Sequence, residues 1–174
     1  MATQKLPEVW LRGAVENIPS LLQPVAHALL QAREEVNELM IDFRDELLWI
    51  KPAGAASVGF HLQHLSGVLD RLYTYVHEKP LSQEQFAQLK AEGDPLRTNK
   101  TTSDLLKDFD KQVDTALKEL HNIREEELTQ PRSVGRAQFP STVIGLLFHS
   151  AEHTMRHVGQ LIVTLKVVNN AATK

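Results

Sequence analysis

The stretch LLFHSAEHTMRHVGQL, residues 146–161, carries three histidines at four-residue steps: His149, His153 and His157. Apolar residues recur around them at three- and four-residue intervals, a period that predicts a helix. Residues four apart on a helix are neighbours on one face, so we expect the three imidazoles to form a single stripe. Leucines and Gln160 fall on or beside this stripe, which places it next to the side that packs into the protein.

A second histidine pair, His61 and His64, lies in GFHLQHL, residues 59–65. The two residues are three apart, so they also share one side of a predicted helix. Imidazole is the commonest protein ligand for divalent transition metals. A metal between two helices can take an i, i+4 pair from one helix and a third ligand from the other, which here means His153 and His157 with His64. Three protein ligands and an open position is the arrangement of a catalytic zinc-type site.

The same residues have a purely structural interpretation. In it, the histidines lie at the edge of the core and hydrogen-bond to backbone groups or to Glu152. Three histidines in line, with a further pair on a preceding helix, favour the metal site over this alternative.

Periodicity over the whole chain predicts an all-α fold, a four-helix bundle in one domain of 174 residues. The four long helices are expected at about residues 20–48, 57–77, 102–120 and 141–168. The connection between the second and third helices, residues 78–102, carries a short extra helix. Its length leaves open whether the bundle is simply up-and-down or has one long return.

Three helix starts have sequence signals. Ser57 is the expected N-cap of the second long helix and Ser141 that of the fourth. Ser82 and Gln85 have the spacing of a capping box, ahead of a short helix that ends near Ala91.

The segments outside the helices are expected to be irregular. Residues 1–19 form an arm that Trp10 and Leu11 attach to the bundle, and residues 169–174 form a flexible tail. Residues 130–140 are a loop that can include a brief extended piece.

Composition excludes several classes of protein. Nineteen basic and 22 acidic residues give a net charge of −3 with no basic stripe, so we expect no nucleic-acid partner. No apolar run approaches the roughly 18 residues of a membrane span, and the N-terminus lacks the apolar core of a signal peptide. The chain has no cysteine, so a metal would depend mainly on nitrogen and oxygen ligands. We expect a cytoplasmic protein without a membrane partner.

Two segments resemble motifs of the DinB / YfiT-like superfamily of metal-dependent proteins. SVGFHLQHLSGVLDRL, residues 57–72, is similar to its second-helix motif, and residues 146–161 are similar to its fourth-helix motif, a histidine pair followed by Gly-Gln. The resemblance implies a four-helix bundle, a homodimer, and a divalent metal, often zinc or nickel, held by three histidines. By position these ligands are His64, His153 and His157.

His61 and His149 are additional to that pattern. Either could be a fourth ligand, support a ligand from behind, or act on the substrate side, and packing is the simpler role for His61. The neighbouring charges Asp70 and Arg71 are expected to be exposed and to contribute little.

A three-histidine site supports two kinds of enzyme. One is a hydrolase in which the metal activates water against a small electrophilic substrate, with His149 or Glu152 moving protons. The other, implied by the resemblance, is a thiol-dependent S-transferase that takes a low-molecular-weight thiol and a small-molecule acceptor. A third hypothesis is a non-catalytic metal-binding or stress-related interaction protein, in which a fourth protein ligand closes the site.

Overall fold

Four long helices form the bundle in the computed structural model, which describes residues 6–172. They are α1 (Gln23–Leu39), α2 (Val58–Val76), α4 (Thr102–Asn122) and α5 (Val143–Ala172). Helix α2 packs against α4 and α5, and α1 packs against the same two helices from the other side. The all-α four-helix bundle predicted from periodicity is therefore confirmed.

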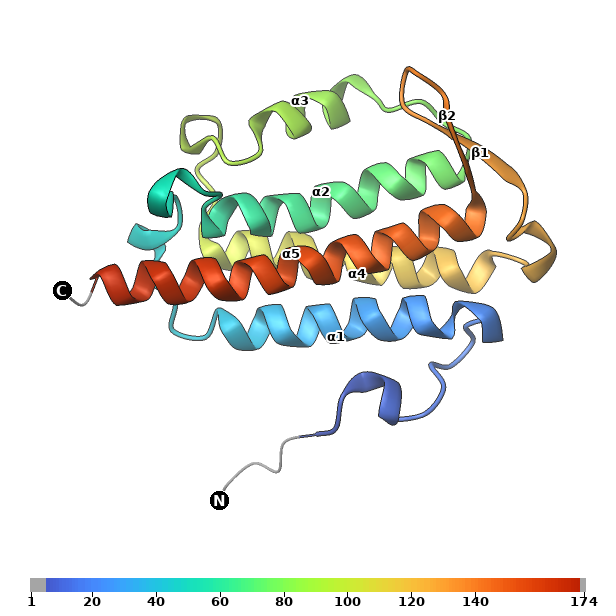
Figure 1. The fold of residues 1–174 in the computed structure, drawn as a ribbon, viewed down its shortest axis with the longest axis horizontal. Helices are drawn as coiled ribbons and strands as arrows, with labels where there is room; N and C mark the ends of the chain where they lie inside the picture. The colour runs from blue at the N-terminus through green and yellow to red at the C-terminus, as the bar shows by residue number, and fades with distance from the viewer. Residues whose placement is uncertain (1–5, 173–174) are drawn as a thin grey trace.

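The helix directions show how the chain connects the bundle. In Figure 1, α1 and α5 run in one direction, while α2 and α4 both run in the other. Two consecutive main helices that are parallel need a long return, and α3 (Gln83–Ala91) runs back along α2 to provide it. The long connection thus makes one crossover, and it carries the expected short helix over the outer side of α2.

Side-chain caps fix where three of these helices begin. The Ser57 hydroxyl accepts from the backbone N–H of Phe60 at 3.1 Å, as predicted for the start of α2. Ser82 and Gln85 form both bonds of the expected capping box at α3. Helix α4 is capped by Thr101, one residue before the predicted start.

The first long helix is shorter than predicted. Helix α1 ends at Leu39, and Asp42, with a φ of 57°, adopts a left-handed conformation that a helix cannot accommodate. The apolar period continues to Leu48 because Leu47, at the end of a short 3₁₀ helix (Asp45–Leu47), and Leu48, directly after it, are also buried. These buried residues continue the apolar pattern of α1 although the α-helix has already ended, so the predicted end at residue 48 is wrong.

The start of the last helix also differs from the prediction. Ser141 is not its cap, because it lies in a two-stranded antiparallel hairpin of β1 (Pro131–Val134) and β2 (Phe139–Thr142). The Thr142 hydroxyl caps the helix instead, accepting from the backbone N–H of Gly145 at 3.1 Å. The brief extended piece expected near residues 130–140 is this hairpin.

Both ends of the chain are more ordered than predicted within the described residues. Helix α5 continues to Ala172, so residues 169–172 of the expected flexible tail are helical; residues 173–174 lie outside the described range. At the other end, Trp10 and Leu11 are 61% and 56% exposed and do not attach the arm. Val9 does, since its side chain is buried and its N–H donates to the Gln31 side chain at 2.9 Å. The first five residues of the predicted arm lie outside the described range.

The core lies on the common axis of the bundle. Each main helix contributes fully buried apolar side chains to one continuous cluster, among them Leu29, Leu65, Phe109 and Leu161. Within residues 6–172, no helix combines the length and apolar character needed to cross a membrane.

Candidate metal centre

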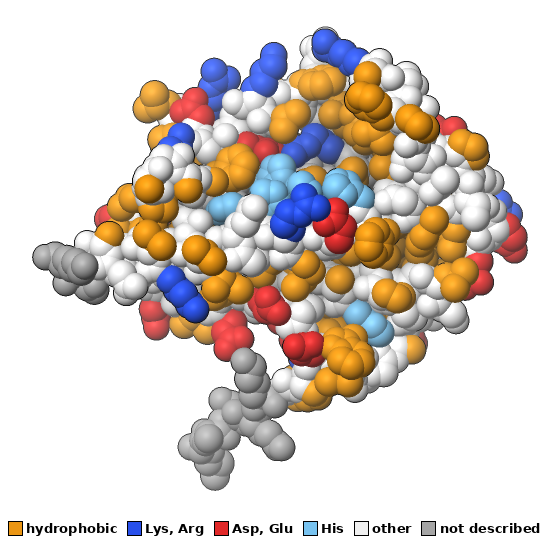
Figure 2. Space-filling model, in the orientation of Figure 1, with side chains coloured by type: hydrophobic (Ala, Val, Ile, Leu, Met, Phe, Trp, Pro, Cys, Tyr) orange, Lys and Arg blue, Asp and Glu red, His pale blue; other side chains and the backbone are white. Residues whose placement is uncertain are grey.

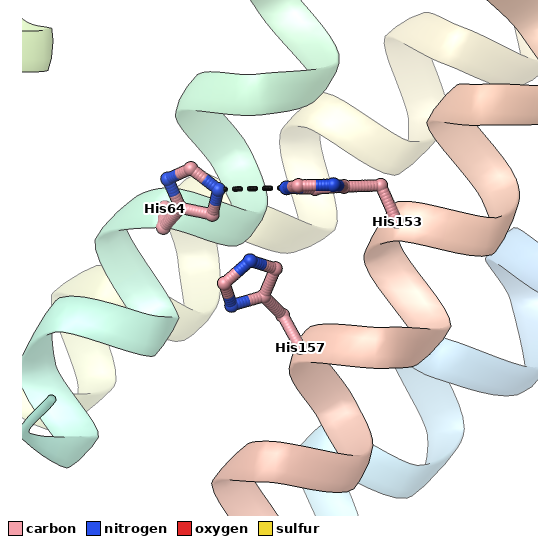
Figure 3. Close-up of side chains that lie close together, drawn as sticks. All are labelled: His64, His153 and His157. Atoms are coloured by element: carbon pink, nitrogen blue, oxygen red, sulfur yellow. Dashed lines mark hydrogen bonds between the residues drawn. The ribbon is translucent and has the colours of Figure 1, made fainter. Parts of the chain in front are cut away.

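Three histidines meet in the space between α2 and α5. His64 comes from α2, and His153 and His157 come from successive turns of α5, as Figure 3 shows. The Nε2 atoms of His64 and His153 are 2.9 Å apart, and the ring centre of His157 lies 4.3 Å from that of His64 and 4.6 Å from that of His153. One nitrogen from each ring lies within 4.8 Å of the other two. The convergence expected from the sequence is therefore present.

The cluster is accessible from one face of the protein. Figure 2 shows histidine side chains grouped near the middle of this face, beside a basic and an acidic side chain. All three rings of the triad are partly buried, and 15% of the His64 side chain is exposed. The triad therefore lies at the surface of this face and not inside the apolar core.

The protonation of the rings suits a cation. Burial, followed by the nearby charge of His64, lowers the pKa of both His153 and His157 to about 4. Both rings are neutral at pH 7 and keep the lone pair that a metal needs. Ligand nitrogens of a tetrahedral zinc site lie about 3.3 Å apart, and the observed spacings of 2.9 Å to at most 4.8 Å bracket that value. The donor set fits a zinc- or nickel-type ion with small side-chain adjustments.

A buried carboxylate supports His64 from behind. Glu92, in the segment that follows α3, accepts from Nδ1 of His64 at 2.7 Å and from Nη1 of Arg71 at 2.7 Å. Burial alone would raise the Glu92 pKa, but the hydrogen bond from His64 and the charge of Arg71 outweigh it and lower the pKa. Glu92 is therefore ionised, and His64 carries its proton on Nδ1. Nε2 of His64 then faces the shared space, 2.9 Å from Nε2 of His153, and a ring oriented from behind in this way is typical of metal-binding histidines.

The positions of Arg71 and Glu92 differ from what the sequence predicts. Arg71 is not an exposed charge, because its side chain is 9% exposed and its partner's is 7% exposed. Glu92 was not among the predicted site residues. Its position depends on the loop after α3, where the N–H of Gly93 donates to the Gln63 side chain of α2 at 2.7 Å. The sequence offers one weak signal, an acidic residue before a glycine directly after a capping-box helix.

Gly67 makes room for this ion pair. A Cβ atom on Gly67 would lie 2.6 Å from Nη1 of Arg71 and 2.6 Å from Oε1 of Glu92, and both groups are buried and fixed by each other. We expect Gly67→Ala to lower the free energy of unfolding by about 1–3 kcal/mol. The matched control is Gly159→Ala, at an exposed position of α5 where an added Cβ atom would meet no atom within 4 Å. This change should stabilise the protein by about 0.5–1 kcal/mol. Urea unfolding of both variants checks the prediction, and equal effects of the two changes would contradict it.

His149 lies at the outer edge of the triad. Its ring centre is 5.1 Å from that of His153, and 46% of its side chain is exposed. Its Nδ1 atom is 2.6 Å from Oε1 of Glu152, whose other oxygen accepts from Arg156 at 2.6 Å. Burial would raise the Glu152 pKa, but the hydrogen bonds from Arg156 and His149 outweigh it and lower the pKa. The His149–Glu152 pair, both predicted as site residues, is thus adjacent to the candidate metal ligands and open to solvent.

His61 occupies the opposite, inner side. It is 3% exposed, and its Nδ1 lies 3.2 Å from Nδ1 of His157. Burial, together with the charge of His64, lowers its pKa to about 4. The structure places His61 behind a candidate ligand rather than in the shared space of the triad.

The low pKa values of His61, His153 and His157 predict how acid affects the metal-free protein. Histidines of the unfolded chain titrate near pH 6.5, whereas these three take up protons only near pH 4 when folded. Between these values the unfolded state binds more protons, so the free energy of unfolding should fall as the pH drops from about 6.5 towards 4. Urea unfolding across this range measures the slope, and His157→Asn should reduce it. A stability that does not change over this range would contradict the prediction.

The fold and the site together define a class of protein: a four-helix bundle with one crossover and a histidine triad shared by its second and last main helices. Comparison identifies the family. The sequence model of the DinB superfamily matches residues 28–161, and the chain belongs to that superfamily. The resemblance inferred from the two histidine motifs is confirmed.

A solved structure supports the fold. A protein from Exiguobacterium sibiricum, described as a member of the DinB family, superposes with a TM-score of 0.66 at 16% sequence identity. The match covers 90% of this chain and 95% of that protein. None of the curated proteins compared with the chain matches it.

Proposed function

We propose that the protein binds one divalent transition metal, zinc or nickel, through His64, His153 and His157, and uses it to activate a small electrophilic substrate. The observation that carries the proposal is the meeting of three imidazoles from two helices, with ligand nitrogens within 4.8 Å of one another. When bound, such a metal lowers the pKa of a coordinated water or thiol and polarises an oxygen of the substrate.

The residues of the chain have distinct roles in this proposal. Glu92 holds His64 in the tautomer that exposes Nε2. His149 and Glu152 lie beside the triad at its open side, where they can accept and return a proton. The chain contains no cysteine, so a thiolate in this site would come from a low-molecular-weight thiol used as substrate.

Reconstitution separates the two reactions. Protein purified without a metal-affinity step is stripped, reloaded with zinc or nickel, and given either activated esters or small thiols with electrophilic acceptors. Metal-dependent consumption of thiol and acceptor together indicates an S-transferase, and ester cleavage without thiol indicates a hydrolase. With either activity, His149→Asn should keep the metal and lose about 100-fold in rate. Tight metal binding with no turnover in both panels would contradict the catalytic part of the proposal.

A non-catalytic metal-binding role is the second candidate. His149, Glu152 and His153 also offer ligand atoms within 4.8 Å of one another, so the outer edge could supply a further ligand and close the site. X-ray absorption spectroscopy of the loaded protein distinguishes the cases, because a fourth protein ligand without an exchangeable water favours a structural site. The homodimer implied by the resemblance stays a prediction, which analytical ultracentrifugation can test.

A further inference from the structure

His61 contacts the far nitrogen of a candidate metal ligand. The Nδ1 atoms of His61 and His157 are 3.2 Å apart, and His61 is 3% exposed on the inner side of the pair. Figure 3 shows a nitrogen of His157 directed into the gap between His64 and His153. Because Nδ1 of His157 faces His61, Nε2 is the nitrogen that remains for this gap.

A hydrogen bond between two neutral imidazoles requires one protonated and one unprotonated nitrogen. His61 is buried and His157 is partly buried where the two nitrogens meet. If His157 is to offer the lone pair of Nε2 to a metal, its proton must be on Nδ1 and be donated to Nδ1 of His61. His61 then carries its own proton on Nε2, which lies 3.5 Å from the hydroxyl oxygen of Thr164. Thr164 is also buried, at 8% exposed, so this side of the site has little contact with bulk solvent.

We propose that His61 is a positioning residue that accepts a hydrogen bond from Nδ1 of His157 and so holds His157 in its metal-binding tautomer and orientation. This inference rests on the proposed metal site. It gives His157 the same kind of support that Glu92 gives His64, from a neutral acceptor on α2 instead of a carboxylate in the crossover. The two α2 histidines thus have different roles, one as a ligand and one as the partner of a ligand.

Nuclear magnetic resonance can test the tautomer without any activity assay. Long-range ¹H–¹⁵N spectra of ¹⁵N-labelled, metal-free protein at neutral pH distinguish protonated from unprotonated ring nitrogens. We expect His157 to be protonated at Nδ1 and His61 at Nε2, and we expect zinc to shift Nε2 of His157 but neither nitrogen of His61. A His157 ring protonated at Nε2 in the metal-free protein would overturn the proposal, and so would a zinc-bound nitrogen of His61.

A pair of variants tests the consequence for binding. His61→Leu fills the buried space but removes the acceptor, and we expect zinc affinity to fall about 10-fold or more. His61→Asn keeps an amide oxygen near the place of Nδ1 and should recover most of the loss. His61→Leu with wild-type zinc affinity would overturn the proposal. If His61→Leu does not fold, the Asn variant and the wild-type spectra still decide.

The experiment separates this inference from the proposed function. Wild-type protein that takes up no zinc or nickel would refute the metal site, while the tautomer in the metal-free protein still tests the hydrogen bond. Wild-type protein that binds zinc with His61 in the wrong tautomer would refute the positioning role and leave the metal site intact.

Discussion

Replacing His153 with alanine should reduce the divalent metal carried by the purified protein from about one ion per chain to a small fraction of that amount. The Nε2 atom of His153 lies 2.9 Å from that of His64, and its ring centre lies 4.6 Å from that of His157. Without it, two imidazoles on different helices remain, and we expect affinity for zinc to fall by more than about 100-fold. Elemental analysis of protein purified without a metal-affinity tag, followed by zinc titration, measures both effects.

The fold should tolerate this change. Nδ1 of His153 is buried without a hydrogen-bond partner, so removal of the ring also removes an unsatisfied polar atom. The matched control is His27→Ala on α1, whose ring contacts the backbone oxygen of Gly13 at 2.9 Å and takes no part in the triad. That variant should keep the wild-type metal content. Equal metal content in the two variants would refute the site.

The meeting of the three histidines could be predicted because their arrangement is mostly local. An i, i+4 pair such as His153 and His157 shares a helix face whatever the rest of the fold does. The only non-local step was the pairing of α5 with α2, which the apolar stripes and the His61–His64 motif both favoured. The start of α2 at Ser57 was equally local, since a cap depends on its own helix.

The partners of the ligands could not be predicted, because they depend on how distant segments come together. Glu92 reaches His64 only after the crossover returns over α2, and nothing near residue 92 in the sequence specifies that return. The burial of Arg71 has the same origin, because α3 and its following loop cover a side chain that would otherwise be exposed. The error at α1 is different in kind: Met40, Leu47 and Leu48 are buried as expected, but apolar residues buried in a turn can have the same spacing as those of a helix.

The second large effect is expected at the Arg71–Glu92 ion pair. Arg71→Leu leaves the buried carboxylate of Glu92 with His64 as its remaining partner, and removal of one member of a buried pair typically costs about 3–5 kcal/mol. For a chain of this size we expect the melting temperature to fall by roughly 10 °C. The matched control, Arg156→Leu, removes an ion pair to Glu152 from an arginine whose side chain is 54% exposed, and it should cost less than about 1 kcal/mol. Thermal and urea unfolding of both variants would show the difference, and equal losses would contradict the interpretation of Glu92 as a buried charge.

The double variant Arg71→Leu/Glu92→Leu separates stability from metal binding. Replacing both members of a buried ion pair with apolar residues is often nearly neutral, so the double variant should recover most of the stability that Arg71→Leu loses. It should not recover metal binding, because His64 then lacks the carboxylate that accepts from its Nδ1 at 2.7 Å in the wild type. Loss of such a supporting partner typically lowers metal affinity about 10- to 100-fold. A stable double variant with weak zinc binding would show that Glu92 acts on the site through His64. A stable double variant with wild-type zinc affinity would instead make the ion pair a structural element of the crossover alone.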